Sequence, residues 1–205
     1  QAIPDLMFQL DAEGTFLDYH GSAANLYLPP ERFLGRKAEE LLPPHVASMT
    51  KENIEETLRS GQLQAYEYEL EIGDKTRHFE CRMVPFDDDE TVAMIRDISE
   101  RRRMEKVRNA LFEISEAANT STDLRDLLGT IRSIVGTLID TTNFYVALYD
   151  ESKDTYSFPY FADEVEGNEF APCDMQGSLT DYVRRTERPL RADEDRHRQL
   201  MAEGK

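Results

Sequence analysis

The stretch Tyr66-Glu67-Tyr68-Glu69-Leu70-Glu71-Ile72 alternates strictly between apolar and acidic side chains. Successive side chains of a β-strand point to opposite faces of its sheet, so the pattern predicts a strand with one buried and one solvated face. Gly73-Asp74 then predicts a turn, after which Phe79, Cys81 and Met83 resume the apolar face. We therefore expect an antiparallel pair of strands here.

The segments around this pair extend the sheet. Asp87-Asp88-Asp89 predicts a second turn, and residues 91–95 predict a third strand. Near the N-terminus, apolar residues alternate over residues 6–10, residues 11–14 form a turn signal, and residues 15–20 resume an extended pattern. The glycine of that turn can adopt a positive φ, so a β-hairpin is expected.

Helices are predicted between the hairpin and the meander. Residues 22–42 break into short helical pieces, which end at Pro43-Pro44 because the residue before a proline is pushed out of the α region. Residues 45–60 predict a longer helix that ends at Gly61. Its apolar face comprises Val46, Met49, Ile54 and Leu58. The expected fold class is α+β with an antiparallel sheet.

A second pattern follows the meander. Residues 96–118 contain no Gly or Pro and are rich in good helix formers. Apolar residues follow one another at steps of three, four, three and four, namely Met104, Val107, Leu111, Ile114 and Ala118. This spacing predicts the seam of a two-stranded coiled coil over residues 99–120, with Ser99 as N-cap. An amphipathic helix packed on its own domain is the alternative, because two heptads fall short of a sustained repeat.

The remaining chain begins a second domain. Ser121 or Thr122 is expected to cap a helix whose apolar stripe comprises Leu124, Leu127, Leu128, Ile131, Val135 and Leu138. A strand is predicted over residues 144–148 and another over residues 155–161, where Pro159 indicates an edge position. An acidic loop over residues 163–177, a helix capped by Ser178 and a short extended piece at residues 189–191 complete the expectation.

Residues 3–98 resemble a PAS domain. Arg96-Asp97-Ile98-Ser99-Glu100-Arg101 is similar to the Asp-Ile-Thr junction at which PAS domains lead into a signalling helix. Phe33-Leu34-Gly35, followed by residues 37–42, is similar to the segment before the long PAS helix. The resemblance implies a sensory domain at residues 1–98 with a five-stranded antiparallel sheet. It also implies that Asp97 and Ile98 form the signal junction; a plain turn and helix cap at Asp97 is compatible with this role.

A PAS pocket would be lined by inward side chains of the sheet and the short helices. The candidates are Phe8, Leu10, Tyr19, Leu26, Phe33, Leu41, Tyr68, Leu70, Cys81 and Met83. Ordinary core packing is the alternative for each of them. Tyr19 and Tyr68 are the expected polar contacts, because a buried hydroxyl needs a partner.

Residues 121–205 resemble the N-terminal portion of a GAF domain. The resemblance rests on residues 143–150, on Gly177-Ser178-Leu179-Thr180-Asp181-Tyr182-Val183, and on Arg188-Pro189-Leu190. A GAF sheet has further strands, so the resemblance implies an incomplete domain. A two-stranded hairpin is marginal alone. We therefore expect Phe144, Val146 and Leu148 to be incompletely covered within one chain, which favours a dimer.

Composition limits the function. The chain has 205 residues and a formal net charge of −17, which disfavours nucleic acid and anionic membranes as partners. No apolar run approaches the roughly 20 residues that span a bilayer, and no signal peptide is visible. Two cysteines are too few for a disulfide framework or a thiolate metal cluster. A reducing cytoplasm is the expected location.

No catalytic constellation or metal-ligand spacing is readable, so neither enzyme activity nor a metal is expected in this chain. His45 would be the ligand in a haem-binding PAS domain, and Cys173 would be the attachment point of a bilin. Cys81 is expected to be a small core residue rather than a flavin-reactive thiol. No cofactor is expected, although an unidentified small-molecule ligand fits the resemblance.

These inferences favour the sensory and relay region of a multidomain bacterial signalling protein, a two-component sensor histidine kinase. The linker helix would form a homodimer, and the output domain would lie C-terminal to this chain. The alternative is a dimerisation and adaptor module without ligand, in a cyclic-dinucleotide cyclase or a transcription activator. A chromophore- or haem-bearing sensor is the third possibility.

Overall fold

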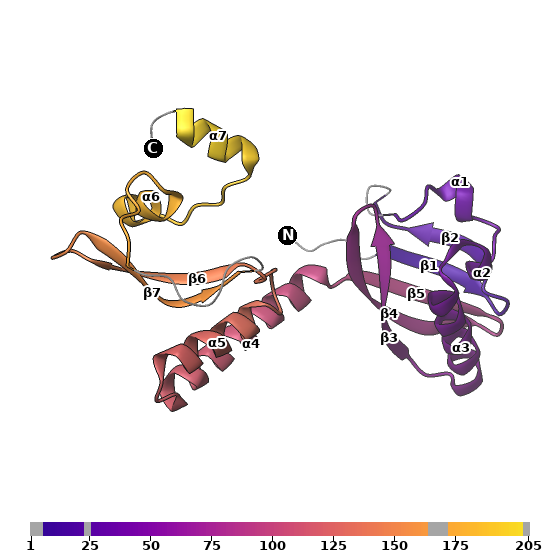
Figure 1. Ribbon diagram of the computed structural model, residues 1–205. Helices are drawn as coiled ribbons and strands as arrows, with labels where there is room; N and C mark the ends of the chain where they lie inside the picture. Colours follow the sequence, from indigo (N-terminus) through magenta and orange to yellow (C-terminus); the bar gives the residue numbers. More distant parts are fainter. Residues whose placement is uncertain (1–5, 23–25, 164–171, 203–205) are drawn as a thin grey trace. The chain divides into compact units, whose positions relative to one another are not determined.

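The computed structural model describes residues 6–22, 26–163 and 172–202, and Figure 1 shows their secondary structure. The chain divides into two compact units, Gln1–Glu105 and Lys106–Lys205. In the part of the chain described, none of the helices is both long and apolar enough to cross a membrane.

The first unit contains a five-stranded antiparallel sheet, as the sequence predicts. Its strand order is β2-β1-β5-β4-β3, so the last strand lies in the centre. The strands are β1 (Leu6–Asp11), β2 (Phe16–His20), β3 (Gln64–Ile72), β4 (Lys75–Asp87) and β5 (Glu90–Asp97). The register places Tyr66 opposite Cys81 and Tyr68 opposite Phe79. The alternating row of β3 therefore faces the same side of the sheet as the apolar row of β4.

Three helices follow the N-terminal hairpin: α1 (Pro30–Phe33), α2 (Ala38–Leu41) and α3 (Pro44–Ser60). Proline at the first position suits the start of α3 because its missing N–H would have no helical partner. Gly61 ends the helix in the left-handed region at φ 66°. The predicted bounds of α3 are thus accurate to one residue.

The buried stripe of α3 differs in part from the predicted one. It comprises Val46, Ala47, Thr50, Ile54 and Thr57, and α3 packs on β3, β4 and β5 with this face. The predicted Met49 and Leu58 are half-buried and lie at the edges of the stripe. Two threonines take their place in the stripe. The hydroxyl of Thr50 is satisfied within the helix, because it donates to the Val46 carbonyl at 2.8 Å.

The core of the first unit joins the sheet to the short helices. Phe33 of α1 makes edge-to-face contacts with Phe8, Phe16 and Tyr19, with ring centroids 5.4–5.5 Å apart. Gly14 turns the β1–β2 hairpin at φ 80°, and a Cβ there would lie 3.6 Å from the Ile54 side chain. The hairpin therefore approaches α3 closely at this glycine.

The second unit contains the C-terminal part of α4 (Ser99–Thr120), then α5 (Leu124–Val135), β6 (Phe144–Asp150), β7 (Thr155–Ala162), α6 (Leu179–Thr186) and α7 (Glu194–Ala202). The N-cap predicted for α5 was wrong: the carboxylate of Asp123 accepts from the Asp126 N–H at 3.0 Å. Leu138 lies beyond the end of α5, so the helical stripe is shorter than predicted. Ser178 caps α6 as predicted, accepting from the Asp181 N–H at 3.2 Å.

Strands β6 and β7 form a two-stranded antiparallel hairpin. Its register shifts between Val146 and Leu148, and the shift lies opposite Pro159, which has no N–H to donate. As expected, the apolar row of β6 is incompletely covered: Phe144 and Val146 are half-buried and Leu148 is 51% exposed.

Two C-terminal expectations differ from the structure. Residues 189–191 form no strand, and α7 follows them although the sequence did not predict it. Of the predicted acidic loop, residues 164–171 lie outside the described residues. Cys173, after that segment, exchanges two backbone hydrogen bonds with Tyr156 on β7 at 2.9 and 3.1 Å.

Candidate functional site

The first unit contains a half-open cavity of about 90 Å³ between the sheet and the short helices. Its wall is formed by Leu6, Phe8, Leu10, Phe16, Leu26, Tyr27, Leu28, Phe33, Leu41, Leu42, Thr50, Tyr66, Leu70, Ile72, Phe79, Ala93 and Ile95. Alternate side chains of one strand point to the same face, which explains why β1 contributes every second residue, Leu6, Phe8 and Leu10. Among the residues that the structure describes, none with an acidic or basic side chain lines the cavity.

The polar atoms of the wall side chains are three hydroxyls, those of Tyr27, Thr50 and Tyr66. The Tyr66 hydroxyl donates to Thr50 Oγ1 at 3.2 Å, and Thr50 Oγ1 donates to the Val46 carbonyl at 2.8 Å. Burial raises the pKa of Tyr66 well above its ordinary value, so its hydroxyl stays protonated. Tyr66 and Thr50 thus form a neutral polar pair in an otherwise apolar wall.

The structure brings part of the predicted pocket set to the cavity. The predicted residues that line it are Phe8, Leu10, Leu26, Phe33, Leu41 and Leu70. Tyr66 and Thr50 were missed. Tyr66 lies in the same alternating row as Tyr68, so its orientation was predictable from the sequence. Thr50 was not, because the helical face was assigned from apolar residues alone.

Four predicted pocket residues do not line the cavity. Cys81 and Met83 are fully buried in the packed core, and burial raises the pKa of the Cys81 thiol to about 12. Cys81 is therefore a protonated core residue with little nucleophilic character. Tyr68 stacks on Phe79 at 5.6 Å, and Tyr19 packs against the edge of Phe33 at 5.4 Å. Neither hydroxyl supplies the expected polar contact.

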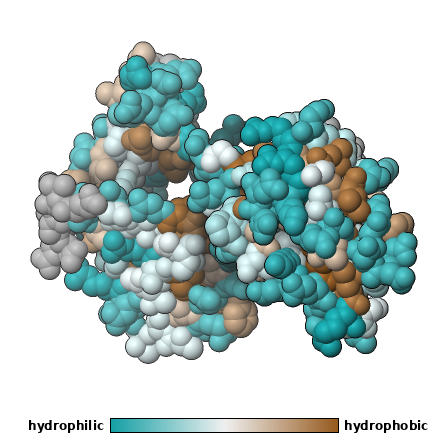
Figure 2. All heavy atoms as spheres, turned by 90° about the vertical axis from the view of Figure 1, so that its right-hand side faces the viewer, coloured by the Kyte–Doolittle hydropathy of each residue, from teal (hydrophilic) through white to brown (hydrophobic). Residues whose placement is uncertain are grey.

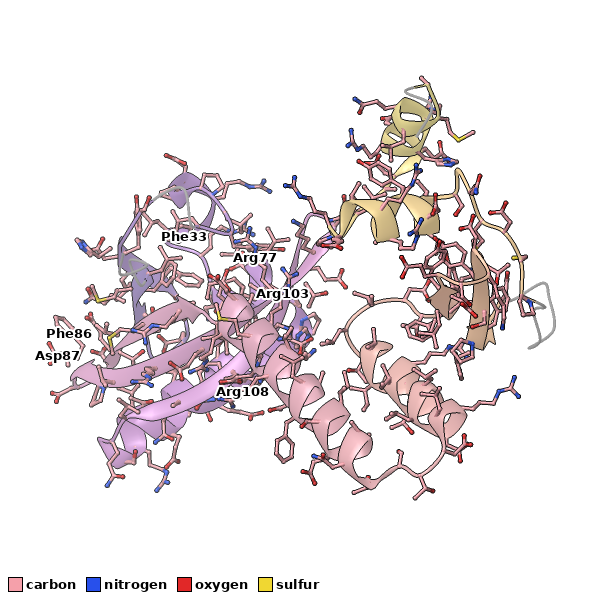
Figure 3. All side chains as sticks on the ribbon, turned by 90° about the vertical axis from the view of Figure 1, so that its left-hand side faces the viewer. Phe33, Arg77, Phe86, Asp87, Arg103 and Arg108 are labelled. Atoms are coloured by element: carbon pink, nitrogen blue, oxygen red, sulfur yellow. The ribbon has the colours of Figure 1, made fainter. Side chains whose placement is uncertain are left out.

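The connection between β5 and α4 is fixed by side-chain and backbone bonds. Asp97 Oδ1 accepts from the Ser99 N–H at 2.9 Å, and its Oδ2 lies 3.5 Å from Arg77 Nη1. Figure 3 shows Arg77 at the end of the sheet where α4 begins, with Phe86 and Asp87 at the opposite end. The Asp97 carboxylate therefore contacts both the turn and the neighbouring strand β4.

Ile98 and Ser99 attach the start of α4 to β4. Ile98 is buried, and its N–H donates to the His78 carbonyl at 2.9 Å. The His78 N–H donates to the Ser99 hydroxyl oxygen at 2.9 Å. The prediction that Ser99 caps α4 was wrong, because its hydroxyl oxygen is the acceptor for a strand N–H. The Ile98 carbonyl accepts the first helical bond, from Arg102, at 2.9 Å.

The basic run at the start of α4 also contacts the sheet. Arg101 and Arg102 both form ion pairs with the carboxylate of Glu67 on β3, the Arg101 contact being 3.3 Å. All three side chains are partly exposed. Sequence alone indicates only a solvated charge run here, since nothing local identifies a partner in a strand more than thirty residues earlier.

The predicted seam of α4 is largely uncovered within one chain. Met104, Val107 and Leu111 are 60%, 40% and 63% exposed. Ala118 is also exposed, whereas Ile114 is half-buried. Figures 1 and 3 both show α5 running alongside the C-terminal part of α4. The row is therefore open over its first two turns and partly covered near Ile114.

A buried carboxylate organises the second unit. Asp181 of α6 is 3% exposed and accepts from the Tyr156 hydroxyl at 2.8 Å. It also pairs with Arg184 and Arg185 at 2.9 Å each. Hydrogen bonds from Arg184 lower the pKa of Asp181, with a further contribution from Tyr156. The Arg184 guanidinium also lies 4.0 Å from the centre of the Tyr149 ring.

The other sequence candidates gain no site around them. His45 is exposed in the first turn of α3 and does not line the cavity. Cys173 is half-buried and is not among the cavity residues. Within the described ranges, no group of three or more His, Cys, Asp or Glu side chains is arranged to hold a metal ion.

The exposed apolar residues of the first unit are dispersed. Figure 2 shows one face of the molecule, on which brown apolar side chains form separate patches among teal hydrophilic ones. Large exposed apolar residues of this unit include Leu17, Tyr27, Leu34, Leu63 and Phe86. Scattered residues of this kind are normal for a protein surface, and the regular row on α4 differs from them.

The strand order, the short helices and the cavity together characterise the first unit as an α+β domain. The family model of the PAS fold matches residues 1–103, just over half of the 205-residue chain. The chain therefore belongs to the PAS fold family, and this part of it is a PAS sensory domain. The GAF resemblance of the second unit stays a prediction.

Three of the solved structures that resemble the first unit are the following. A domain of an HTR-like protein from Haloarcula marismortui is 24% identical, with 46% of this chain and 97% of that chain covered and a TM-score of 0.37. The RpfR quorum-sensing receptor PAS domain from Cronobacter turicensis is 21% identical, with 48% and 96% covered and a TM-score of 0.40. A sensory box sensor histidine kinase from Vibrio cholerae is 12% identical, with 45% and 81% covered and a TM-score of 0.38. No curated protein matches the chain.

Proposed function

We propose that this chain is the sensory and relay region of a multidomain bacterial signalling protein, with its output domain C-terminal to these residues. A two-component sensor histidine kinase is the parent protein we favour. In this proposal the PAS domain receives a signal in its cavity and α4 transmits it. No bond-making step takes place in these residues, and no cofactor takes part.

The observation that best supports this proposal is the arrangement of two neighbouring residues on β3. Tyr66 lines the cavity, and Glu67, the next residue, forms ion pairs with Arg101 and Arg102 of α4. Neighbouring residues of a strand point to opposite faces. A displacement of β3 at the cavity wall would therefore act directly on the ion pairs at the start of the helix.

The junction at Asp97 and Ile98 supplies the second connection. Both residues and Ser99 are bonded to β4, the strand that pairs with β3. We propose that the sheet and the first turn of α4 move together between two arrangements, and that a signal shifts their populations.

We propose that α4 pairs with the same helix of a second copy. The open residues Met104, Val107 and Leu111 have the spacing of a coiled-coil seam, and burying them would remove apolar surface from water. We interpret the second unit as the N-terminal portion of a GAF domain, whose missing strands would cover the exposed side chains of β6. Nucleic acid and membrane are not partners in this proposal, and the location is the cytoplasm.

The alternative, a ligand-free adaptor of a cyclase or a transcription activator, shares the helix pairing. The cavity favours the sensor over this adaptor, because its apolar wall retains about 90 Å³ of unfilled space. Well-packed cores contain few voids larger than a water molecule. Ligand binding at this cavity therefore distinguishes the two functions.

Sedimentation velocity of the full chain tests the proposed pairing. Leu111→Glu places a charge in the seam, so its dimer should dissociate at concentrations at least about tenfold higher than those at which the parent dimer dissociates. The matched control is Asn109→Glu, which adds the same charge to an exposed position on another face of α4. The control should stay dimeric. A parent chain that is monomeric at all workable concentrations would refute the pairing.

A further inference from the structure

We infer that the PAS cavity selects a small, uncharged, mostly apolar molecule with one hydroxyl group, the chemistry of a short-chain alcohol, which would bond to the Tyr66–Thr50 pair. This inference rests on the proposed sensory function and names the ligand class of that site. It depends on three properties of the cavity: the charge of its wall, its volume and the free hydrogen-bonding capacity of its polar pair.

The wall excludes ions. Its described side chains include no Lys, Arg, His, Asp or Glu, so a charged ligand would lose its hydration without gaining a counter-ion from them. The upward shift in the pKa of Tyr66, whose largest cause is burial, indicates that this environment already disfavours a charge. Carboxylates and ammonium groups are therefore poor ligands for this cavity.

The volume limits the part of a ligand that the cavity can hold to a few atoms. The cavity of about 90 Å³ is smaller than the roughly 150 Å³ of an engineered apolar cavity that takes up benzene, a six-carbon ring. Scaling from that example gives about four non-hydrogen atoms of ligand inside the cavity. 1-Propanol has this size, and propylammonium is its cationic counterpart of nearly the same shape.

The polar pair leaves an acceptor free. The Tyr66 hydroxyl uses its proton on Thr50, and the Thr50 hydroxyl uses its own on the Val46 carbonyl. A phenolic oxygen retains acceptor capacity, of which the neighbouring Cys81 thiol, a weak donor, can use only part. A ligand that donates one hydrogen bond therefore completes the pair, which favours a hydroxyl over a carbonyl.

Methyl NMR titration of the full chain tests this inference. 1-Propanol should give saturable shifts at the methyl groups of Leu10, Leu70 and Ile95, which line the cavity. Propylammonium should bind these positions about tenfold more weakly or not at all, and acetone should bind more weakly than 1-propanol. Equal affinity for propylammonium, or tighter binding of acetone, would overturn the inference.

A pair of variants locates the hydroxyl contact. Tyr66→Phe removes the acceptor and should weaken 1-propanol binding about threefold or more. Tyr68→Phe is the matched control, because Tyr68 is on the same strand but does not line the cavity. The two variants having the same effect would contradict the assigned contact.

The outcomes separate this inference from the proposed relay. If no probe gives saturable shifts, the cavity is not a site for this ligand class and the inference fails. The pairing of α4 is decided independently by the sedimentation of Leu111→Glu. A charged probe that binds tightly would leave the sensory function intact and refute only the ligand class.

Discussion

The two β-structures of this chain are held together by different interactions. In the first unit the central strand β5 is paired on both sides, and α3 buries Ile54 against the core. In the second unit β6 and β7 form a two-stranded hairpin in which Leu148 is half-exposed. The second unit also buries a carboxylate, that of Asp181, which accepts a hydrogen bond from Tyr156. Both units bury apolar side chains, and the second unit adds a buried hydrogen-bonded ionic network around Asp181.

Core truncation should have the largest effect, and only on the first unit. Ile54 is 1% exposed, so Ile54→Ala should lower the free energy of unfolding of that unit by about 2–5 kcal/mol. Urea unfolding followed by circular dichroism measures the change, and hydrogen exchange assigns it to the unit. The control is Leu63→Ala at an exposed leucine, which should cost less than about 0.5 kcal/mol. Equal losses in the two variants would show that the core is not packed as described.

Removal of the buried carboxylate should have the next largest effect, confined to the second unit. Asp181→Asn leaves Arg184 and Arg185 without their anionic partner, so hydrogen exchange of α6 should accelerate while that of the first unit stays unchanged. Asp195→Asn is the control, since Asp195 pairs with a single arginine on the exposed side of α7. Unchanged exchange of α6 in Asp181→Asn would show that the network does not hold this helix.

Lowering the pH should also affect the second unit through its buried carboxylate. Because Arg184 and Tyr156 lower the pKa of Asp181 in the folded chain, its contribution to stability is complete above the ordinary aspartate pKa of about 3.9. That contribution is lost as the pH falls through the lowered folded pKa. The protection of the α6 amides against hydrogen exchange should therefore fall over this pH range in the parent chain. The Asp181→Asn variant should lack this pH-dependent loss of protection. An identical pH profile for both chains would exclude Asp181 as its cause.

The smallest effect should come from the ion pairs between β3 and α4. Exposed pairs contribute only about 0.2–1 kcal/mol each, so Glu67→Gln should barely change global stability. It should nevertheless speed hydrogen exchange in the first turn of α4, where Arg101 and Arg102 lose their partner. Glu71→Gln, on the same face of β3, is the matched control. Equal exchange in the two variants would argue against a mechanical role for Glu67.

The parts of the fold that depend on periodicity were predictable from the sequence. The alternation at residues 66–72 correctly predicted which side chains of β3 share a face with the apolar row of β4. The glycine at position 61 correctly predicted the end of α3. Helix caps were less predictable, because several neighbouring polar residues compete for one position. Asp123 caps α5 in place of Ser121 or Thr122, and Ser99 bonds to a strand instead of its own helix.

Contacts between distant residues could not be read from the sequence. Tyr156 and Asp181 are 25 residues apart, and Glu67 precedes its arginine partners by more than 30. Each side chain alone fits a solvated surface, so only the tertiary structure identifies the pairing. The cavity shows the same limit: the apolar row of β3 was predicted, but the partnership of Tyr66 with Thr50 depends on how α3 crosses the sheet.

Disulfide cross-linking across α4 tests the central claim, that this helix pairs with its counterpart in a second copy, most directly. Leu111→Cys and Asn109→Cys would be compared in a Cys173→Ser background, in which the remaining Cys81 is buried. A disulfide requires Cα atoms about 4.4–6.8 Å apart, a distance met at a seam but not on the opposite faces of two paired helices. If α4 pairs in this way, Leu111→Cys should rapidly form a covalent dimer, and Asn109→Cys should form little. Equal cross-linking at the two positions, or none at either, would contradict it.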